Sequence, residues 1–390
     1  MKNTTPFTKN RFLGRQIETL EERLCLTVAV DVIRGDLVVS GDADGEVAIH
    51  AMGDGVYEVT DNGELVSTAK GVKRDIRIRL DLKDPTEDNT VSVNLNEENI
   101  RGLFAKLGGG DDTFALTGGM ARRIGVLTAG GDDTITIDSH AHDFRAVMGG
   151  GSDSLTVGEN AMIKRRFFTA LGSGDNDLTV DGAIRRGAVI QGGHQTDTVV
   201  VSETGTLAHS MIRLGGGENN VEVHGTTRDM RIFSGAPRPK PGEEPGTSAA
   251  HVLIGETGRL NGKLLVMTQG HHGSDTLTIA GTVNGHVGFG DHVPPPGPGG
   301  PGGDANLGSN EIVITETASI KGNVFARFHG SLSSVDHFGT IGRDLRVHTD
   351  IRDNTSVTID EDAVIGGRFI FHAKDDQGDG GGNGGGPGGR

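Results

Sequence analysis

Apolar and polar residues alternate along short segments of this chain, and these segments recur at a nearly fixed distance. Each repeat begins with glycines and an acidic or amide pair, followed by a polar residue and then by apolar residues on either side of one position, as in GGDDTITI from position 130. We mark each repeat by the residue before its first apolar position. In the clearest run these marks are Thr113, Thr134, Ser154, Asp177, Thr198 and Asn220. Successive marks are therefore 21, 20, 23, 21 and 22 residues apart.

This spacing predicts stacked coils of β-strands. Alternation with period two, rich in β-branched residues and bounded by Gly and Asp, predicts strands and excludes an amphipathic helix. A period near 20 residues is typical of folds in which each coil depends on its neighbours for a core. Each repeat holds a first strand, as at Ile135 and Ile137, a polar or Gly corner, and a second strand, as at Leu264 and Val266. We therefore predict an all-β fold, a parallel β-solenoid (β-helix or β-roll-like) with about 21 residues per coil and two or three short strands per turn.

The repeat continues on both sides of the clear run. Further marks occur at Thr90, His251, Thr276, Glu311, Ser334 and Ser356. Some twelve coils at a rise of ~4.8 Å each would form a rod of roughly 55 to 60 Å. The two widest gaps between marks contain segments dense in Pro and Gly, which cannot form a ladder and are predicted to be loops that leave the stack.

A different β segment precedes the coils. Its strand candidates, residues 37–40, 46–51 and 56–60, are separated by Gly-rich turn signals. Because an open stack exposes the edge and the apolar face of its first coil, we predict that this segment is an N-terminal β cap. The predicted organisation is a leader (1–27), a β-rich N-terminal cap (28–85), regular coils (86–235), a Pro-rich loop insertion (236–249), further coils (250–293), a Pro- and Gly-rich loop insertion (294–308), C-terminal coils (309–373) and a disordered Gly-rich tail (374–390).

The N-terminal residues lack the apolar region of an ordinary signal peptide. The segment IETLEERLCL, residues 17–26, resembles the LEPR-XLL type of leader found on large surface proteins of planctomycete bacteria. The matching residues are Leu20, Glu21, Arg23, Leu24 and Leu26. Glu22 and Cys25 depart from that pattern. The resemblance implies export and an extracellular or cell-surface location; the alternative is a frayed amphipathic turn with no targeting role.

Composition narrows the possible partners. The net charge of −16 at pH 7 argues against nucleic acid, because phosphate binding needs a cationic surface. No stretch approaches 18 uninterrupted apolar residues, so no transmembrane segment is predicted. The single cysteine, Cys25, excludes an internal disulfide framework. Although 390 residues would suggest two or three domains, a repeat grows without one large core, and one elongated domain fits better.

The glycine turns carry most of the candidate chemistry. If coils stack in register, their carboxylates line one edge at about one strand spacing, ~5 Å, where like charges repel by roughly 0.8 kcal/mol in water. A calcium ion between turns would reverse the sign of that interaction, and calcium prefers carboxylate and turn carbonyl oxygens. The candidate metal ligands are Asp111, Asp112, Asp132, Asp133, Asp153, Asp175, Asp177 and Asp197.

The turns partly resemble the calcium-binding nonapeptide GGxGxDxUx of haemolysin-type β-rolls, best at residues 108–114 and 172–178. The resemblance implies calcium as a cofactor. However, this chain has one acidic phrase per coil where the nonapeptide repeats without interruption, and it has His194, Gln195 and Asn219 where acids are wanted. The alternative is that Asp, Asn and Gly form the turns and cap backbone N–H groups. Both interpretations remain open and can hold at different coils.

Basic residues precede the second strand of several coils. They are Arg122, Arg123, Arg145, Lys164, Arg165, Arg166, Arg185, Arg186, Arg228 and Arg343. Such a row could hold an anionic polysaccharide through charge-assisted hydrogen bonds, or form a solvated face paired with nearby acids. Aromatic residues are scarce, at 4%, and we expect nearly all of them, including Phe114 and Phe167, to point inward, which disfavours a sugar-cleaving cleft.

These patterns favour a non-enzymatic secreted or cell-surface β-solenoid that acts as a structural spacer or adhesion protein. Its expected partners are an anionic polysaccharide or other cell-surface components. The rival hypothesis is a β-helix polysaccharide lyase or hydrolase acting on acidic glycans. Because carboxylates recur in every coil, no catalytic pair stands out, and we predict no catalytic residues.

Overall fold

The computed structural model describes residues 28–41, 45–80, 86–235, 248–268, 273–291, 309–329, 332–350 and 354–373. The predicted leader (1–27), the tail (374–390) and the insertion 294–308 lie outside these residues, as does all of the insertion 236–249 except its last two positions. The predictions for those segments therefore stay predictions.

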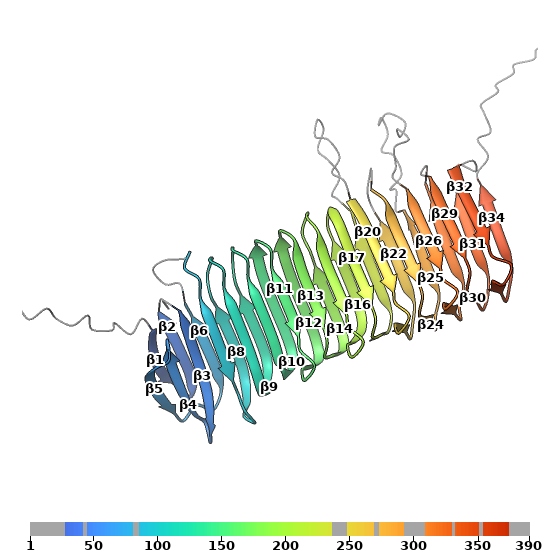
Figure 1. Ribbon diagram of the computed structural model, residues 1–390. Helices are drawn as coiled ribbons and strands as arrows, with labels where there is room; N and C mark the ends of the chain where they lie inside the picture. The colour runs from blue at the N-terminus through green and yellow to red at the C-terminus, as the bar shows by residue number, and fades with distance from the viewer. Residues whose placement is uncertain are drawn as a thin grey trace, which may run out of the picture.

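The chain folds as an all-β parallel solenoid of about 11 turns with roughly 23 residues per turn, and the described part contains no α-helix. Figure 1 shows the strands stacked along one axis, from the blue N-terminal strands to the red last coil. The predicted fold class is confirmed. The mean turn is longer than 21 residues because the chain connects β19 (Met230–Ser234) to β20 (Ser248–Ile254), and β25 (Val287–Asp291) to β26 (Asn310–Ile314), through long segments.

One long sheet collects the first strand of every coil. Its members are β3 (Glu46–Gly53), β7 (Thr90–Asn94), the start of β9 (Thr113–Leu127), the start of β10 (Thr134–Gly150), β11 (Ser154–Val157), β13 (Asn176–Val180), β15 (Asp197–Val201), β17 (Gly217–Val223), β20, β23 (Asp275–Ile279), β26, β29 (Ser333–His337) and β32 (Thr355–Ile359). Each of the twelve sequence marks pairs with the next in parallel register, from Thr90 opposite Thr113 to Ser334 opposite Ser356.

A second long sheet collects the other strand of each coil. It contains β2 (Asp36–Gly41), β6 (Asp75–Arg79), β8 (Asn99–Lys106), the ends of β9 and β10, β12 (Met162–Ser173), β14 (Ala183–Gln191), β16 (Thr206–Leu214), β19, β22 (Leu264–Thr268), β25, β28 (Val324–Phe328), β31 (Leu345–Thr349) and β34 (Phe369–Ala373). In the later coils a two-residue strand forms the corner between the sheets. These corner strands are β18 (Thr226–Thr227), β21 (Arg259–Leu260), β24 (Thr282–Val283), β27 (Ser319–Ile320), β30 (Thr340–Ile341) and β33 (Val364–Ile365).

The core lies between the two sheets and runs the length of the rod. In most strands of the two sheets every second residue is buried, so aliphatic side chains from successive coils stack on one another, as Ile135 does on Leu155. The rings of Phe144 and Phe167 also stack, with centroids 5.2 Å apart and planes 16° apart. Each coil therefore depends on its neighbours for burial, as the repeat spacing predicts.

The N-terminal end is covered by antiparallel strands. β1 (Val28–Ile33) pairs with β2, while β4 (Val56–Asp61) and β5 (Glu64–Lys70) extend from β3 as a meander. Asp54 and Asn62 adopt positive φ angles of 53° and 50° in the two turns that the Gly-rich signals predict. At the opposite end, Val364 and Phe369 in the last described coil are 52% and 43% exposed.

Candidate functional site

The turns before the first sheet contain an inner column of buried carboxylates and amides. At most of these positions the backbone N–H donates to the side-chain oxygen of the counterpart in the next coil, whereas Asn176 reaches Asp197 through its side-chain Nδ2 at 2.8 Å. The N–H of Asp112 donates to Oδ1 of Asp133 (2.9 Å), that of Asp133 to Asp153 (3.0 Å), that of Asp153 to Asn176 (3.0 Å), and that of Asp197 to Asn219 (3.1 Å). These side chains satisfy strand-edge donors that the turn leaves without a ladder partner.

An outer column of exposed acids makes the opposite connection. Here the backbone N–H of the later coil donates back to the carboxylate of the earlier one. Oδ1 of Asp111 accepts from the N–H of Asp132 (2.7 Å), Asp132 from Ser152 (2.6 Å), and Asp175 from Thr196 (2.9 Å). The two columns therefore link the same turns in both directions along the rod.

Burial changes the acidity of the inner column. It raises the pKa of Asp133 to about 6 and that of Asp153 to about 7, and it also raises the pKa of Asp197. The Oδ2 atoms of Asp133 and Asp153 are buried without a hydrogen-bond partner among the described residues. Protonation would remove a buried charge at each of these positions.

The eight candidate metal ligands fall into three groups in the structure. Asp112, Asp133, Asp153 and Asp197 belong to the inner column, Asp111, Asp132 and Asp175 to the outer column, and exposed Asp177 begins the outward face of its strand. Within the residues that the structure describes, no three His, Cys, Asp or Glu side chains gather closely enough to hold a metal ion. Calcium binding stays a prediction, and the observed contacts are those of turn formation.

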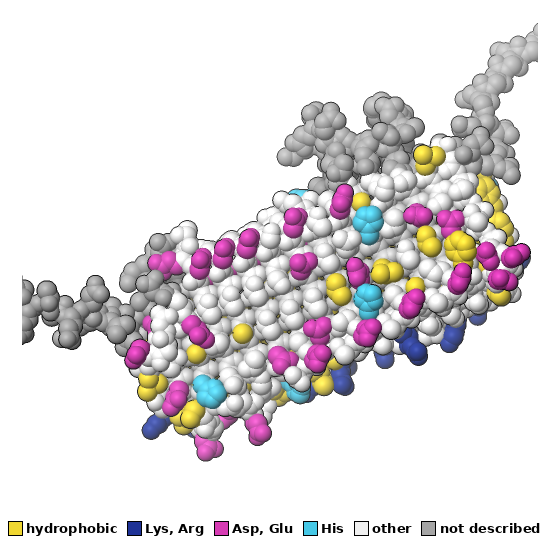
Figure 2. Space-filling view, in the orientation of Figure 1, with side chains coloured by type: hydrophobic (Ala, Val, Ile, Leu, Met, Phe, Trp, Pro, Cys, Tyr) yellow, Lys and Arg dark blue, Asp and Glu magenta, His cyan; other side chains and the backbone are white. Residues whose placement is uncertain are grey.

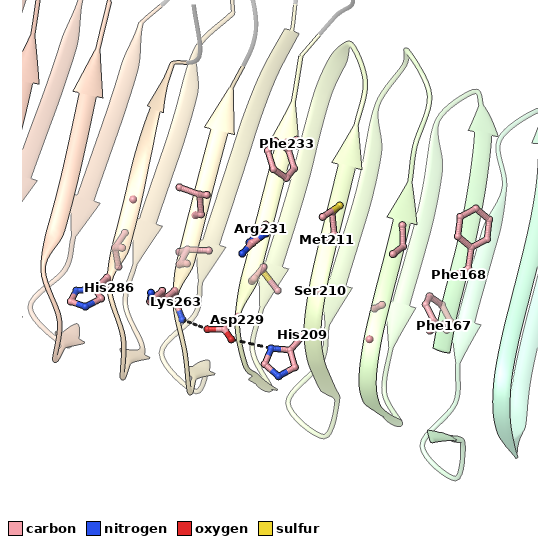
Figure 3. Close-up of a pocket in the computed structure, with 18 of the residues that line it drawn as sticks. Phe167, Phe168, His209, Ser210, Met211, Asp229, Arg231, Phe233, Lys263 and His286 are labelled. Carbon is pink, nitrogen blue, oxygen red and sulfur yellow. Dashed lines mark hydrogen bonds and ion pairs between the residues drawn. The ribbon is translucent and has the colours of Figure 1, made fainter. Parts of the chain in front are cut away.

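The outward face of the second sheet contains a different site, a groove of about 960 Å³ that crosses successive coils. One column of residues forms its floor, each paired in register with the next. In order along the rod these are Phe168, Val189, Met211, Arg231, Leu265, Gly288 and Phe325. Figure 3 shows Met211 and Arg231 on neighbouring strands of this face, with Phe168 two strands before Met211.

An arginine stacks on the aromatic ring at each end of the groove. The guanidinium carbon Cζ of Arg145 lies 5.3 Å from the ring centre of Phe168, and that of Arg346 lies 5.5 Å from the ring centre of Phe325. These distances are within the range of a cation–π interaction. Both arginines belong to the same column as the floor residues, one coil beyond each phenylalanine.

Polar residues line one long side of the groove. Oδ2 of Asp229 lies 3.0 Å from Nδ1 of His209, and Oδ1 of Asp229 accepts the backbone N–H of Lys263 at 2.8 Å. Figure 3 shows both contacts. The pKa of Asp229 is lowered, first by the Lys263 N–H and then by the nearby His209. The side chain of Lys263 is exposed and makes no ion pair within the described part of the chain.

The residues of the predicted basic row do not share one environment in the structure. Arg145 stacks on Phe168 just beyond the end of the groove. Exposed Arg166 lines the groove, and its Nε pairs with Asp143 at 3.2 Å. Phe168 and Phe325 line the outward face, contrary to the expectation that nearly all phenylalanines point into the core. Period-two alternation from buried Phe167 would have placed Phe168 outside.

Charge is unevenly distributed over the rod. Figure 2 shows one face with scattered Asp and Glu, while Lys and Arg are visible mainly along its lower edge.

No helix of the described chain is long and apolar enough to cross a membrane. Comparisons with known protein families, with curated proteins and with solved structures found no match for this chain.

Proposed function

We propose that this protein is a non-enzymatic extracellular or cell-surface rod that acts as a spacer or adhesion element. The observation that carries the proposal is the unbroken register of the first sheet from Thr90 to Ser356. Backbone hydrogen bonds along two sheets hold the coils together, and side chains cap the turns at one edge. Such a stack resists bending, and the number of coils sets its length.

Two further features support an extracellular role. The resemblance of residues 17–26 to a planctomycete surface-protein leader implies export. The surplus of acidic residues, which gives the net charge of −16, favours solubility of an exposed repeat protein.

Deletion of whole coils tests the spacer role. Removing residues 154–197 joins Asp153 to Thr198 and deletes two coils in register. We expect cooperative melting to persist and the maximum dimension in solution scattering to fall by ~10 Å, which is two strand spacings. The matched control is removal of residues 155–165, which do not make up a whole number of coils. This deletion should abolish cooperative melting, because it breaks the register of both sheets.

Location is tested separately in the native cells. An epitope tag placed after Gly388 should be labelled by antibody on intact cells and removed by added protease. Labelling that appears only after the cells are permeabilised would contradict the extracellular proposal.

A further inference from the structure

The groove on the second sheet exposes cations that the protein itself leaves unpaired. Arg231, at the middle of the floor, is exposed and makes no ion pair with any described residue. The same holds for Arg145, which stacks on Phe168 just beyond one end, whereas the charge of Lys263 at the side acts on Asp229. In a chain with 53 acidic and 37 basic residues, cations without carboxylate partners gathered on an apolar floor indicate a surface complementary to an anion.

The groove also has a defined length and symmetry. Phe168 and Phe325 are six coils apart, ~29 Å at one strand spacing per coil, and Arg231 lies three coils from each. Along the same column, Arg145, Arg231 and Arg346 recur every four coils, ~19 Å apart. The groove thus offers widely spaced positive charges that are separated by apolar and aromatic contacts.

We propose that this groove binds an extended acidic polysaccharide in which charged sugars are separated by neutral ones. The planar guanidinium of Arg231 can form paired hydrogen bonds with a sugar carboxylate. The C–H faces of neutral pyranose rings can pack on Phe168, Leu265 and Phe325, since stacked apolar contacts need no charge. A linear chain fits a straight groove that presents one equivalent position in every coil.

Other occupants fit this surface less well. A second copy of the chain, docked by a two-fold axis at the centre of the groove, would bring two Arg231 guanidiniums together. A nucleic acid strand carries a negative charge on every nucleotide, and the acidic rod would repel such a dense polyanion. A sparsely charged glycan needs only a few cations and benefits from the apolar floor.

Binding to gellan oligosaccharides tests this proposal, because gellan carries one carboxylate in each four-sugar repeat. With the purified full chain, we expect calorimetry to detect binding of the acidic oligosaccharide, and carboxyl-reduced gellan of the same length to bind at least about tenfold more weakly. Binding of the reduced form with equal affinity, or tighter binding of polygalacturonate or oligo-dT, would overturn the proposal. So would the absence of binding to gellan.

Variants locate the site on the rod. Arg231→Gln should weaken gellan binding by about tenfold, and Arg231→Lys by less, because lysine keeps the charge but loses the planar fork. Arg228→Gln removes an exposed arginine of the same coil outside the groove and is the matched control, with unchanged binding expected. An equal loss of gellan affinity in the Arg228 and Arg231 variants would show that gellan is attracted only by the general positive charge.

The spacer proposal does not depend on this result. Coil deletion and surface labelling test the rod, whereas gellan binding tests the groove. Melting temperatures of the Arg231 and Arg228 variants should equal that of the wild type, since both side chains are exposed.

Discussion

The backbone N–H of Asp133 donates to Oδ1 of Asp153, 3.0 Å away in the next coil, and both side chains are buried. One coil further, the N–H of Asp153 makes the same bond to the amide oxygen of Asn176, also at 3.0 Å. The position therefore requires a side-chain oxygen that accepts a hydrogen bond, and a neutral amide supplies one as well as a carboxylate does.

The stability of the rod should consequently depend on pH. Burial raises the pKa of folded Asp153 from 3.8 to about 7, so the folded protein holds a proton that the unfolded chain releases across this range. The stability that the folded state gains by keeping Asp153 protonated is fully present below pH 3.8 and is lost as the pH rises through 7. Asp153→Asn should raise the free energy of unfolding at pH 8 by on the order of 2 kcal/mol and leave it nearly unchanged at pH 4.

Thermal melts at pH 4 and pH 8 check this prediction. Glu311→Gln, an exposed acid of the first sheet six coils away from Asp153, is the matched control and should keep the pH dependence of the wild type. An Asp153→Asn protein that melts below the wild type at pH 8 would show that the buried charge itself is needed.

Calcium should leave the melting temperature unchanged. Oδ1 of the carboxylates in both columns already accepts a backbone N–H group of a neighbouring turn, so the turns are connected without an ion. Calorimetry with added calcium and then with chelator measures the effect. A calcium-dependent rise in melting temperature that disappears in the Asp132→Asn, Asp133→Asn double variant would instead show that ions bridge neighbouring turns.

Glycine is required where the turns stack. Gly151 has a φ of +128°, and a Cβ there would collide with the backbone carbonyl of Gly131 in the preceding coil. Gly151→Ala should therefore destabilise the protein by about 2–4 kcal/mol, measured by chemical denaturation. Gly187→Ala is the matched control, because a Cβ at Gly187 meets nothing within 4 Å, and it should change stability little. Equal stability of the two variants would mean that the turns are not in contact.

No cleavage of acidic glycans is expected. In the proposed complex the glycan contacts only separated arginines and apolar side chains, and Asp229 is held by His209 and the Lys263 N–H. Polygalacturonate, alginate and gellan incubated with the protein should release no unsaturated or reducing ends. Release of such ends, lost in Lys263→Gln but kept in Arg228→Gln, would establish the lyase alternative.

The register of the rod could be predicted because local chemistry determines it. In the clearest coils a glycine-rich turn precedes the strand by the same few residues, so the marks from Thr90 to Ser356 locate the coils from β7 onward, even across the long connections after β19 and β25. The direction of the turn hydrogen bonds could not be predicted, since Asp132 and Asp133 are adjacent and differ only in burial.

The groove could not be predicted for a different reason. Phe168, Arg231 and Phe325 lie in separate coils and become one column only when the second sheet is aligned, and that sheet has no repeated sequence mark. The predicted basic row followed residue type without strand alternation, and therefore grouped Arg145 with Arg166, whose nearest partner is Asp143.

The most direct test of the stacked coils is a pair of distances along one outward column. Thr136 and Thr278 are six coils apart, and Thr358 lies three coils further. With Cys25 replaced by Ser and spin labels placed on two of these threonines at a time, pulsed electron resonance should give ~29 Å for the first pair and ~43 Å between Thr136 and Thr358. Distances that do not increase in proportion to the number of intervening coils would contradict the in-register solenoid.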